Sequence, residues 1–99
     1  MAAYLVVEVD YNDIAWTEAY RREVPGMMER CGARYLAKTL SPERIEGERP
    51  SPQTLAVVEF PSAEEARAFL CSEEYRPYAE ARRAGSRTQM YLLEGISQV

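Results

Sequence analysis

The chain has 99 residues, 46% of them hydrophobic, and a formal net charge of −4. A chain of this length forms one domain, which buries only about 60 to 65% of its unfolded surface. The excess of acidic residues argues against sequence-independent binding to nucleic acids or anionic membranes, since both need clustered cations. We therefore expect a single domain over residues 1–99 that gains further burial as a homodimer, without nucleic-acid or membrane partners.

The start of the chain and its cysteines indicate where the protein resides. A short apolar run precedes Glu8 without a cationic segment or a cleavage signal, so the pattern matches neither a signal peptide nor a membrane span. Cys31 and Cys71 form neither a C-x-x-C pair nor a disulfide framework, and we expect both to be reduced core residues. Together these features predict a cytoplasmic protein.

Residues 3–10 read AYLVVEVD, which is typical of a strand with two largely buried faces. Alternation places one set of side chains on each face, with Leu5, Val7 and Val9 on the first and Tyr4, Val6 and Glu8 on the second. Because an antiparallel sheet usually has one wet face, we expect a second layer or a second subunit to cover the far side.

A long helix is predicted next, capped by Asn12 or Asp13 and extending to Cys31. Pro25 lies inside this helix and should bend or interrupt it, because the ring removes a hydrogen bond and clashes one turn back. The segment 33–39 then predicts a second strand. Its alternation puts Arg34, Leu36 and Lys38 on one face and Tyr35 and Ala37 on the other.

The second half of the chain contains the clearest local signal. After a polar connection over 40–53, with a short edge strand around 44–47 as an option, residues 54–60 predict a strand. Ser62 and Glu65 then form a capping box that starts a helix at Ala63. A second helical stretch over 72–85 and a last strand over 87–94 complete the chain.

The order of these elements predicts an α+β fold of the ferredoxin-like βαββαβ type, with a four-stranded antiparallel sheet and helices on one face. The other sheet face would carry a mixture of Val, Leu, Tyr and single charges. Such a face favours a dimer interface that encloses a partly polar cavity rather than a surface exposed to solvent.

Several segments together resemble a known family. These segments are AYLVVEVD, VPGMMERCGARYLAK, VVEFPSAEEARAFLCSEEY and YLLEG, and they are spread over residues 3–95. They resemble the domain-of-unknown-function 1330 family of bacterial proteins, within the dimeric α+β barrel superfamily; residues 40–53 depart from it by lacking its Gly-Gly pair. The resemblance implies the fold and the homodimer, but no reaction. The superfamily spans cofactor-free monooxygenases, polyketide cyclases, haem-degrading enzymes and muconolactone-type isomerases.

The chain contains no histidine. This removes the usual general base near neutral pH and the usual ligand of haem and of metal ions. We therefore expect no metal and no cofactor. Among the chemistries of the superfamily, haem degradation and histidine-dependent cyclisation fit this composition poorly.

Charged residues of the predicted strands form the candidate catalytic set, namely Glu59, Lys38, Arg34 and Glu8. A carboxylate in an apolar cavity can act as an acid or a base, because burial raises its pKa. Arg34 or Lys38 can bind an anionic or enolate oxygen. The alternative is that Glu8 or Glu59 pairs with one of these cations and only neutralises charge.

Aromatic residues supply the candidate substrate-binding set. Tyr75, Tyr78 and Arg82 share one face of the last predicted helix and could line a cavity entrance, or could pack against the sheet edge. Tyr4 and, depending on the register, Tyr91 or Glu94 would join them from the strands. We interpret Trp16 and Tyr20 as packing between helix and sheet.

Two functions remain open on this basis. The first is a cofactor-free enzyme that acts on a small aromatic or polyketide-like molecule in the cavity of a dimeric barrel, by proton transfer or oxygenation. The second is a non-catalytic dimeric module that binds a small ligand or supports another protein.

Overall fold

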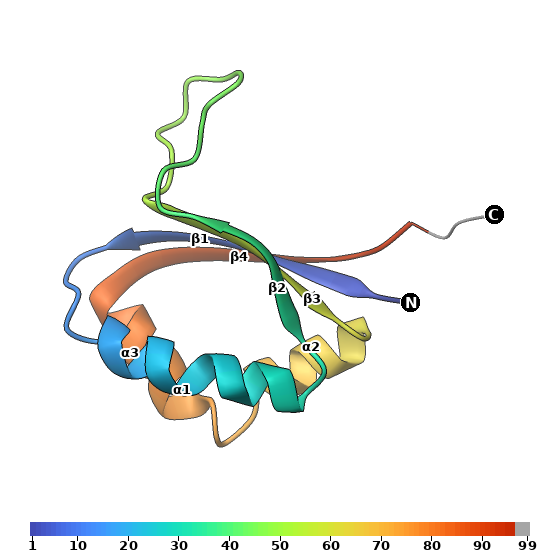
Figure 1. The fold of residues 1–99 in the computed structure, drawn as a ribbon. Coiled ribbons are helices and arrows are strands. Elements are labelled where there is room, and N and C mark those ends of the chain that lie inside the picture. The colour runs from blue at the N-terminus through green and yellow to red at the C-terminus, as the bar shows by residue number, and fades with distance from the viewer. Residues whose placement is uncertain (97–99) are drawn as a thin grey trace.

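A computed structural model describes residues 1–96 as a four-stranded sheet with three helices (Figure 1). The strands are β1 (Ala3–Tyr11), β2 (Arg34–Thr39), β3 (Thr54–Phe60) and β4 (Ser86–Glu94), and the helices are α1 (Thr17–Arg30), α2 (Ala63–Leu70) and α3 (Arg76–Gly85). The strand order is β2-β3-β1-β4, and every neighbouring pair is antiparallel. This arrangement confirms the predicted ferredoxin-like fold.

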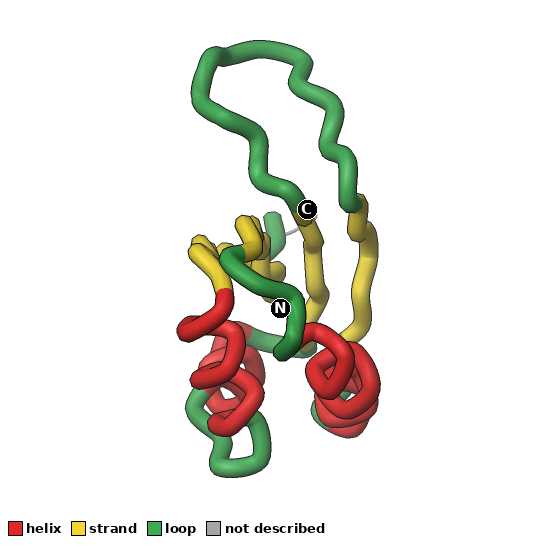
Figure 2. The backbone as a smooth tube through the Cα atoms, turned by 90° about the vertical axis from the view of Figure 1, so that its left-hand side faces the viewer, coloured by secondary structure: helices red, strands yellow, loops and turns green. Residues whose placement is uncertain are grey.

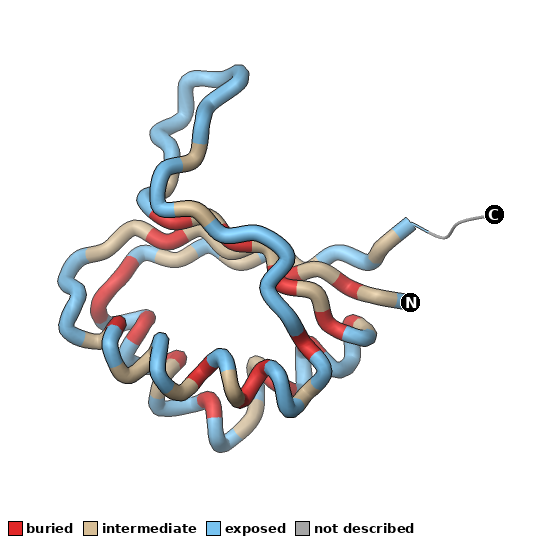
Figure 3. Tube along the Cα trace, in the orientation of Figure 1, coloured by how far each residue is buried: buried red, intermediate tan, exposed pale blue. Residues whose placement is uncertain are grey.

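The helices lie together on one side of the sheet, and the core fills the space between the two layers (Figure 2). Leu5, Val58 and Phe60 point into this space and are at most 2% exposed. We call this side of the sheet the inner face and the opposite side the outer face. Burial alternates along β3, where every inner-facing position is buried and every outer-facing position is half-buried. Figure 3 shows that buried residues occur in both the strands and the helices.

The strand-to-helix junction forms as the sequence predicts. The Oγ atom of Ser62 accepts a hydrogen bond from the backbone N–H of Glu65 at 3.1 Å. This bond satisfies one of the free donors at the start of α2. The helix then buries Ala66 and Phe69 against the core.

Helix α1 differs from its prediction at its start and at Pro25. It begins at Thr17, because the backbone N–H groups of Asn12 and Asp13 donate to the carbonyl oxygen of Gly85 at 2.9 and 3.1 Å and hold the preceding turn. It also continues through Pro25, so the expected interruption is wrong. Burial of Val24 and its neighbours in the core stabilises the helix across the missing hydrogen bond.

Residues 40–53, all of which the structure describes, contain no strand, so the optional edge strand around 44–47 is wrong. They form a loop that projects from the sheet on the side away from the helices (Figure 1). Ile45 within this loop is 85% exposed. Across residues 1–96, no helix has both the length and the hydrophobicity needed to cross a membrane.

The expectation that both cysteines belong to the core is wrong for Cys71, whereas Cys31 packs against the core. Cys31 is half-buried and Cys71 is exposed, and both are free thiols. Each follows the last residue of a helix, α1 or α2, at a point where the chain turns towards the surface. Helical spacing alone therefore predicted too much burial for Cys71.

Candidate functional site

A cavity of about 400 Å³ lies between the inner face of the sheet and the helices. Its apolar walls include inner-facing residues of β1 and β3, namely Leu5, Val7, Val9, Ala56 and Val58. This volume lies in the range of small-molecule sites, which are typically apolar with a few polar groups. The polar groups of this cavity come from the strands β1, β2 and β3, from α1 and α3, and from the turns that precede these two helices.

A row of aromatic rings crosses the core beside this cavity. Neighbouring ring centroids in the row are 4.6 to 6.1 Å apart, in the order Tyr11, Trp16, Tyr20, Tyr75, Phe69, Phe60. The first members of the row, Tyr11 to Tyr75 in that order, line the cavity. The cavity therefore offers a ligand flat aromatic surfaces that are fixed by their neighbours.

Trp16 is held by the backbone on two sides. Its Nε1–H donates to the carbonyl oxygens of Asp13 at 3.0 Å and Gly85 at 3.2 Å. Gly85 also permits the close approach, because a Cβ atom there would lie 2.2 Å from Cδ1 of Trp16. The end of α3 thus fixes the position of the indole ring.

Two tyrosine hydroxyls meet at the cavity wall. The hydroxyls of Tyr20 and Tyr75 are 2.6 Å apart, and Tyr75 is only 1% exposed. Burial raises the pKa of Tyr20 well above its ordinary value, Tyr75 raises it further, and the nearby charge of Arg82 opposes both effects more weakly. Tyr20 therefore stays protonated at neutral pH and acts as a hydrogen-bonding group rather than as a base.

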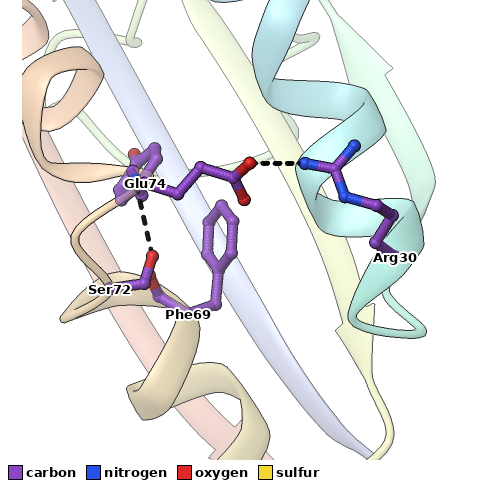
Figure 4. A network of polar contacts seen from close by, with 5 residues as sticks. Arg30, Phe69, Ser72 and Glu74 are labelled. Carbon is purple, nitrogen blue, oxygen red and sulfur yellow. Dashed lines mark hydrogen bonds and ion pairs between the residues drawn. The ribbon is translucent and has the colours of Figure 1, made fainter.

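The turn before α3 places Tyr75. The Oγ atom of Ser72 donates to the carbonyl oxygen of Phe69 at 2.8 Å and accepts from the backbone N–H of Tyr75 at 3.3 Å. Glu74 forms an ion pair with Arg30 at 2.7 Å, which connects the turn to α1 (Figure 4). Contacts to two helices thus orient the tyrosine towards its partner.

Arg82 brings a buried positive charge to the same cavity. The residue is 6% exposed, and within residues 1–96 its Nε–H has no hydrogen-bond partner. The other cationic residues of the lining are Arg21 and Lys38, and both are exposed. Among the described residues, no Asp or Glu lines the cavity, so its charged groups are all positive.

Lys38 lies on a different face from the one predicted. A β-bulge follows Tyr35 and shifts the alternation of β2 by one residue. Lys38 pairs with Ala56, which faces the helices, and its Nζ atom lies 5.6 Å from the ring centroid of Tyr35. The expectation that Lys38 shares a face with Arg34 is therefore wrong, and the residue lines the cavity instead.

The remaining charged candidates lie on the outer face. Nε of Arg34 is 2.8 Å from Oε1 of Glu59 on the neighbouring strand. Glu8 lies 4.0 Å from Nη2 of Arg49, which belongs to the loop of residues 40–53. The strand register places Tyr4 and Tyr91 on this face as well, whereas Glu94 falls on the opposite alternation.

The predicted site residues are therefore divided between two faces. Tyr75, Arg82 and Lys38 line the inner cavity, while Tyr78 is half-buried against the core beside it. The candidates on the outer face are Glu8, Glu59, Arg34, Tyr4 and Tyr91. The single pocket that the strand pattern allowed for all of them does not form, because the bulge and the sheet separate the two groups.

Two cavity residues, Trp16 and Tyr20, were predicted only to pack between helix and sheet. Trp16 and Tyr20 are spaced i, i+4 and, with Val24, form the stripe of α1 that faces the sheet. The available signal was their polar atoms, since a buried indole N–H or phenol needs a hydrogen-bond partner. Among the described residues, no group of three or more His, Cys, Asp or Glu side chains is arranged to hold a metal ion.

Comparison with known families identifies the chain's relatives. A family model described as Domain of unknown function (DUF1330) matches residues 2–96. The chain belongs to this family. A comparison with curated proteins finds no match.

Solved structures share the fold of this DUF1330 member. A protein of unknown function from Rhodopseudomonas palustris superposes with a TM-score of 0.81 at 15% identity, covering 98% of this chain and 84% of that one. SnoaB, a cofactor-independent oxygenase from Streptomyces nogalater, gives 0.68 at 17% identity, covering 99% and 96%. An antibiotic biosynthesis monooxygenase gives 0.60 at 14% identity, covering 98% and 100%. At such identities the likeness concerns the fold alone.

Proposed function

We propose that this protein is a cofactor-free enzyme acting on a small aromatic or polyketide-like molecule bound between the sheet and the helices. The observation that carries this proposal is the cavity of about 400 Å³, with aromatic walls and a hydroxyl pair formed by Tyr20 and Tyr75. Its size and its mixture of apolar walls with few polar groups are typical of sites for small organic ligands.

The polar groups of the cavity favour one class of chemistry. The hydroxyl pair of Tyr20 and Tyr75 can donate one hydrogen bond to a phenolate or enolate oxygen, since its other O–H is used within the pair, and Arg82 and Lys38 can add positive charge. Such an arrangement stabilises negative charge that forms on the substrate. The reactions that use it without a cofactor are proton transfer and oxygenation of an enolate, and the shared fold with SnoaB, a cofactor-independent oxygenase, favours oxygenation.

We further propose that the protein is a cytoplasmic homodimer formed through the outer face of the sheet. Tyr91 and Leu93 on this face are each 51% exposed, next to half-buried aliphatic side chains of β1 and β3. An apolar sheet face of this kind is usually covered by another layer. Here Glu8, Glu59 and Arg34 would serve pairing and register between subunits, and the free thiols fit a reducing compartment.

Oxygen uptake with anthrone as the probe tests the enzymatic proposal. The oxidation consumes one O₂ per anthrone and yields anthraquinone and water, so oxygen and product can be measured together. We expect the protein to accelerate it, and Tyr75→Phe to slow it by about 10- to 100-fold through loss of an oxyanion donor. Tyr91→Phe on the outer face should leave the rate unchanged. The opposite pattern, a loss with Tyr91→Phe alone, would move the site to the outer face.

The second candidate is a non-catalytic dimeric binding module. The observation that favours it is the absence of Asp and Glu from the described lining, which leaves the cavity without a carboxylate base. Native mass spectrometry of the purified protein separates the two functions. A dimer that retains a small molecule, but shows no turnover with aromatic ketones and phenols, would support the binding module and contradict the enzyme.

A further inference from the structure

Arg82 carries a buried charge for which the chain provides no counter-charge. The side chain is 6% exposed, its Nε–H has no hydrogen-bond partner, and no ion pair within residues 1–96 includes it. A guanidinium remains protonated at any physiological pH. Buried charges in proteins are normally paired, since an isolated one is costly.

The surroundings of Arg82 do not supply the missing partner. The lining of the cavity contains no Asp or Glu among the described residues, and none of its hydroxyls accepts a hydrogen bond from the Nε–H of Arg82. The remaining charges of the lining, on Arg21 and Lys38, are also positive and lie at exposed positions. The cavity therefore holds one deeply buried positive charge beside aromatic walls.

We propose that the ligand of this cavity is an aromatic carboxylic acid whose carboxylate pairs with Arg82. This inference rests on the proposed function and names its substrate class. The planar guanidinium matches a carboxylate in geometry, and an opposite unit charge offsets part of the cost of burying Arg82. A single buried cation fits a monoanion rather than a more highly charged and more strongly hydrated phosphate. The ring system of the acid would lie against Trp16 and Tyr20.

Isothermal titration with a matched pair of probes tests this assignment. The probes are 2-naphthoate and 2-naphthamide, which share their shape but differ in charge. We expect the wild-type protein to bind the naphthoate at least about tenfold more tightly than the amide, because only the acid carries a negative charge that pairs with the guanidinium. Arg82→Met should remove this preference by weakening naphthoate binding much more than amide binding.

Arg83→Met is the matched control. It removes the same charge from the same helix, but Arg83 is exposed and does not line the cavity. We expect it to retain the preference for the acid. A thermal unfolding scan checks that Arg82→Met is folded. If this variant does not fold, the relative affinities of the wild-type protein for the two probes still test whether the cavity prefers a carboxylate.

The outcomes separate the two proposals. Equal affinity for naphthoate and naphthamide would overturn the carboxylate assignment, while binding of both would leave the proposed aromatic site intact. An equal loss of preference in Arg83→Met would overturn the role of Arg82. Failure of the wild-type protein to bind either probe overturns the assignment as well, and only a lack of anthrone turnover together with that failure would also overturn the proposed function.

Discussion

Charged side chains are paired with each other on the outer face of the sheet, whereas the buried charge on its inner side is not. On the outer face each candidate carboxylate lies near an arginine, with Glu59 2.8 Å from Arg34 and Glu8 4.0 Å from Arg49. On the inner side of the sheet, Arg82 of α3 is buried without a carboxylate among the described residues that line its cavity. Paired charges at a half-exposed surface favour solubility and a defined register between strands or subunits. An unpaired buried charge is costly unless a ligand of opposite charge binds to it. Pairing, rather than the presence of charge, distinguishes the two faces.

The largest expected effect separates core from outer face with two leucines. Leu5 is 2% exposed on the inner face, whereas Leu93 is 51% exposed on the outer face. We expect Leu5→Ala to lower the free energy of unfolding by about 2 to 5 kcal/mol because it opens a cavity in the core. Leu93→Ala should cost less than about 0.5 kcal/mol in the monomer. Urea denaturation measures both.

The stability of the same two variants at different protein concentrations tests whether the outer face forms the dimer interface. If the proposed homodimer forms through the outer face, Leu93→Ala should lose more stability at high protein concentration than at low concentration. Leu5→Ala should show no such trend beyond that of the wild-type protein. Equal costs for the two substitutions at low concentration would contradict the distinction between the faces.

The next effect concerns Gly85, which allows the indole ring of Trp16 to pack against the end of α3. A Cβ atom at Gly85 would lie 2.2 Å from the indole ring, so Gly85→Ala must displace it. We expect a loss of about 1 to 3 kcal/mol from overpacking, together with weaker ligand binding. Gly26→Ala is the control, since its Cβ would meet nothing closer than 3.7 Å within α1. It should gain about 0.5 to 1 kcal/mol, and a loss there comparable to that of Gly85→Ala would contradict the steric explanation.

A smaller effect follows from the raised pKa of Tyr20. Because the pKa is higher in the folded state than in the unfolded state, the tyrosine stabilises the fold fully below its ordinary value of 10.0, and this stability is lost as pH rises above it. The loss from one such proton is about 1.4 kcal/mol per pH unit. Tyr20→Phe should reduce the slope of stability against pH above about 10, where chemical denaturation at several pH values measures it. An unchanged slope would show that the hydroxyl is not buried.

The smallest effect is expected for the ion pair on the outer face. Arg34 is 71% exposed, so its bond to Glu59 is screened by water. Glu59→Gln should cost about 0.2 to 1 kcal/mol in the monomer, and a double-mutant cycle with Arg34→Met isolates the coupling between the two side chains. A cost of several kcal/mol would indicate that this pair is buried, which would remove the contrast with Arg82.

Local elements of the fold could be predicted from the sequence, because their signals lie within a few residues. Ser62 and Glu65 mark the start of α2, and the bounds of β3 match the predicted 54–60. The face of Lys38 could not be predicted, since the bulge in β2 depends on its pairing with β3. A prediction from periodicity assumes that side chains alternate between the two faces without a break, so it cannot anticipate the extra residue of a β-bulge.

The cavity could not be predicted from local sequence patterns either. Its hydroxyl pair joins Tyr20 to a residue 55 positions away, and the contact of Trp16 with Gly85 spans 69 positions. The spacing of Tyr75 and Arg82 did place them on one helix face, and both line the cavity. What the sequence could not show is that Arg82 has no counter-charge there, because that depends on which acidic residues the folded chain leaves outside the cavity.

A titration followed by ¹H–¹⁵N NMR shows whether a small molecule binds between the inner face of the sheet and the helices. Trp16 is the single tryptophan of the chain, so its indole N–H gives one unambiguous signal from the cavity, and the Nε–H of Arg82 gives a second. On addition of 2-naphthoate we predict that both signals shift, while the backbone amide signals of Tyr91 and Leu93 on the outer face stay in place. Shifts confined to the outer face, with the Trp16 and Arg82 signals unchanged, would contradict binding at this site.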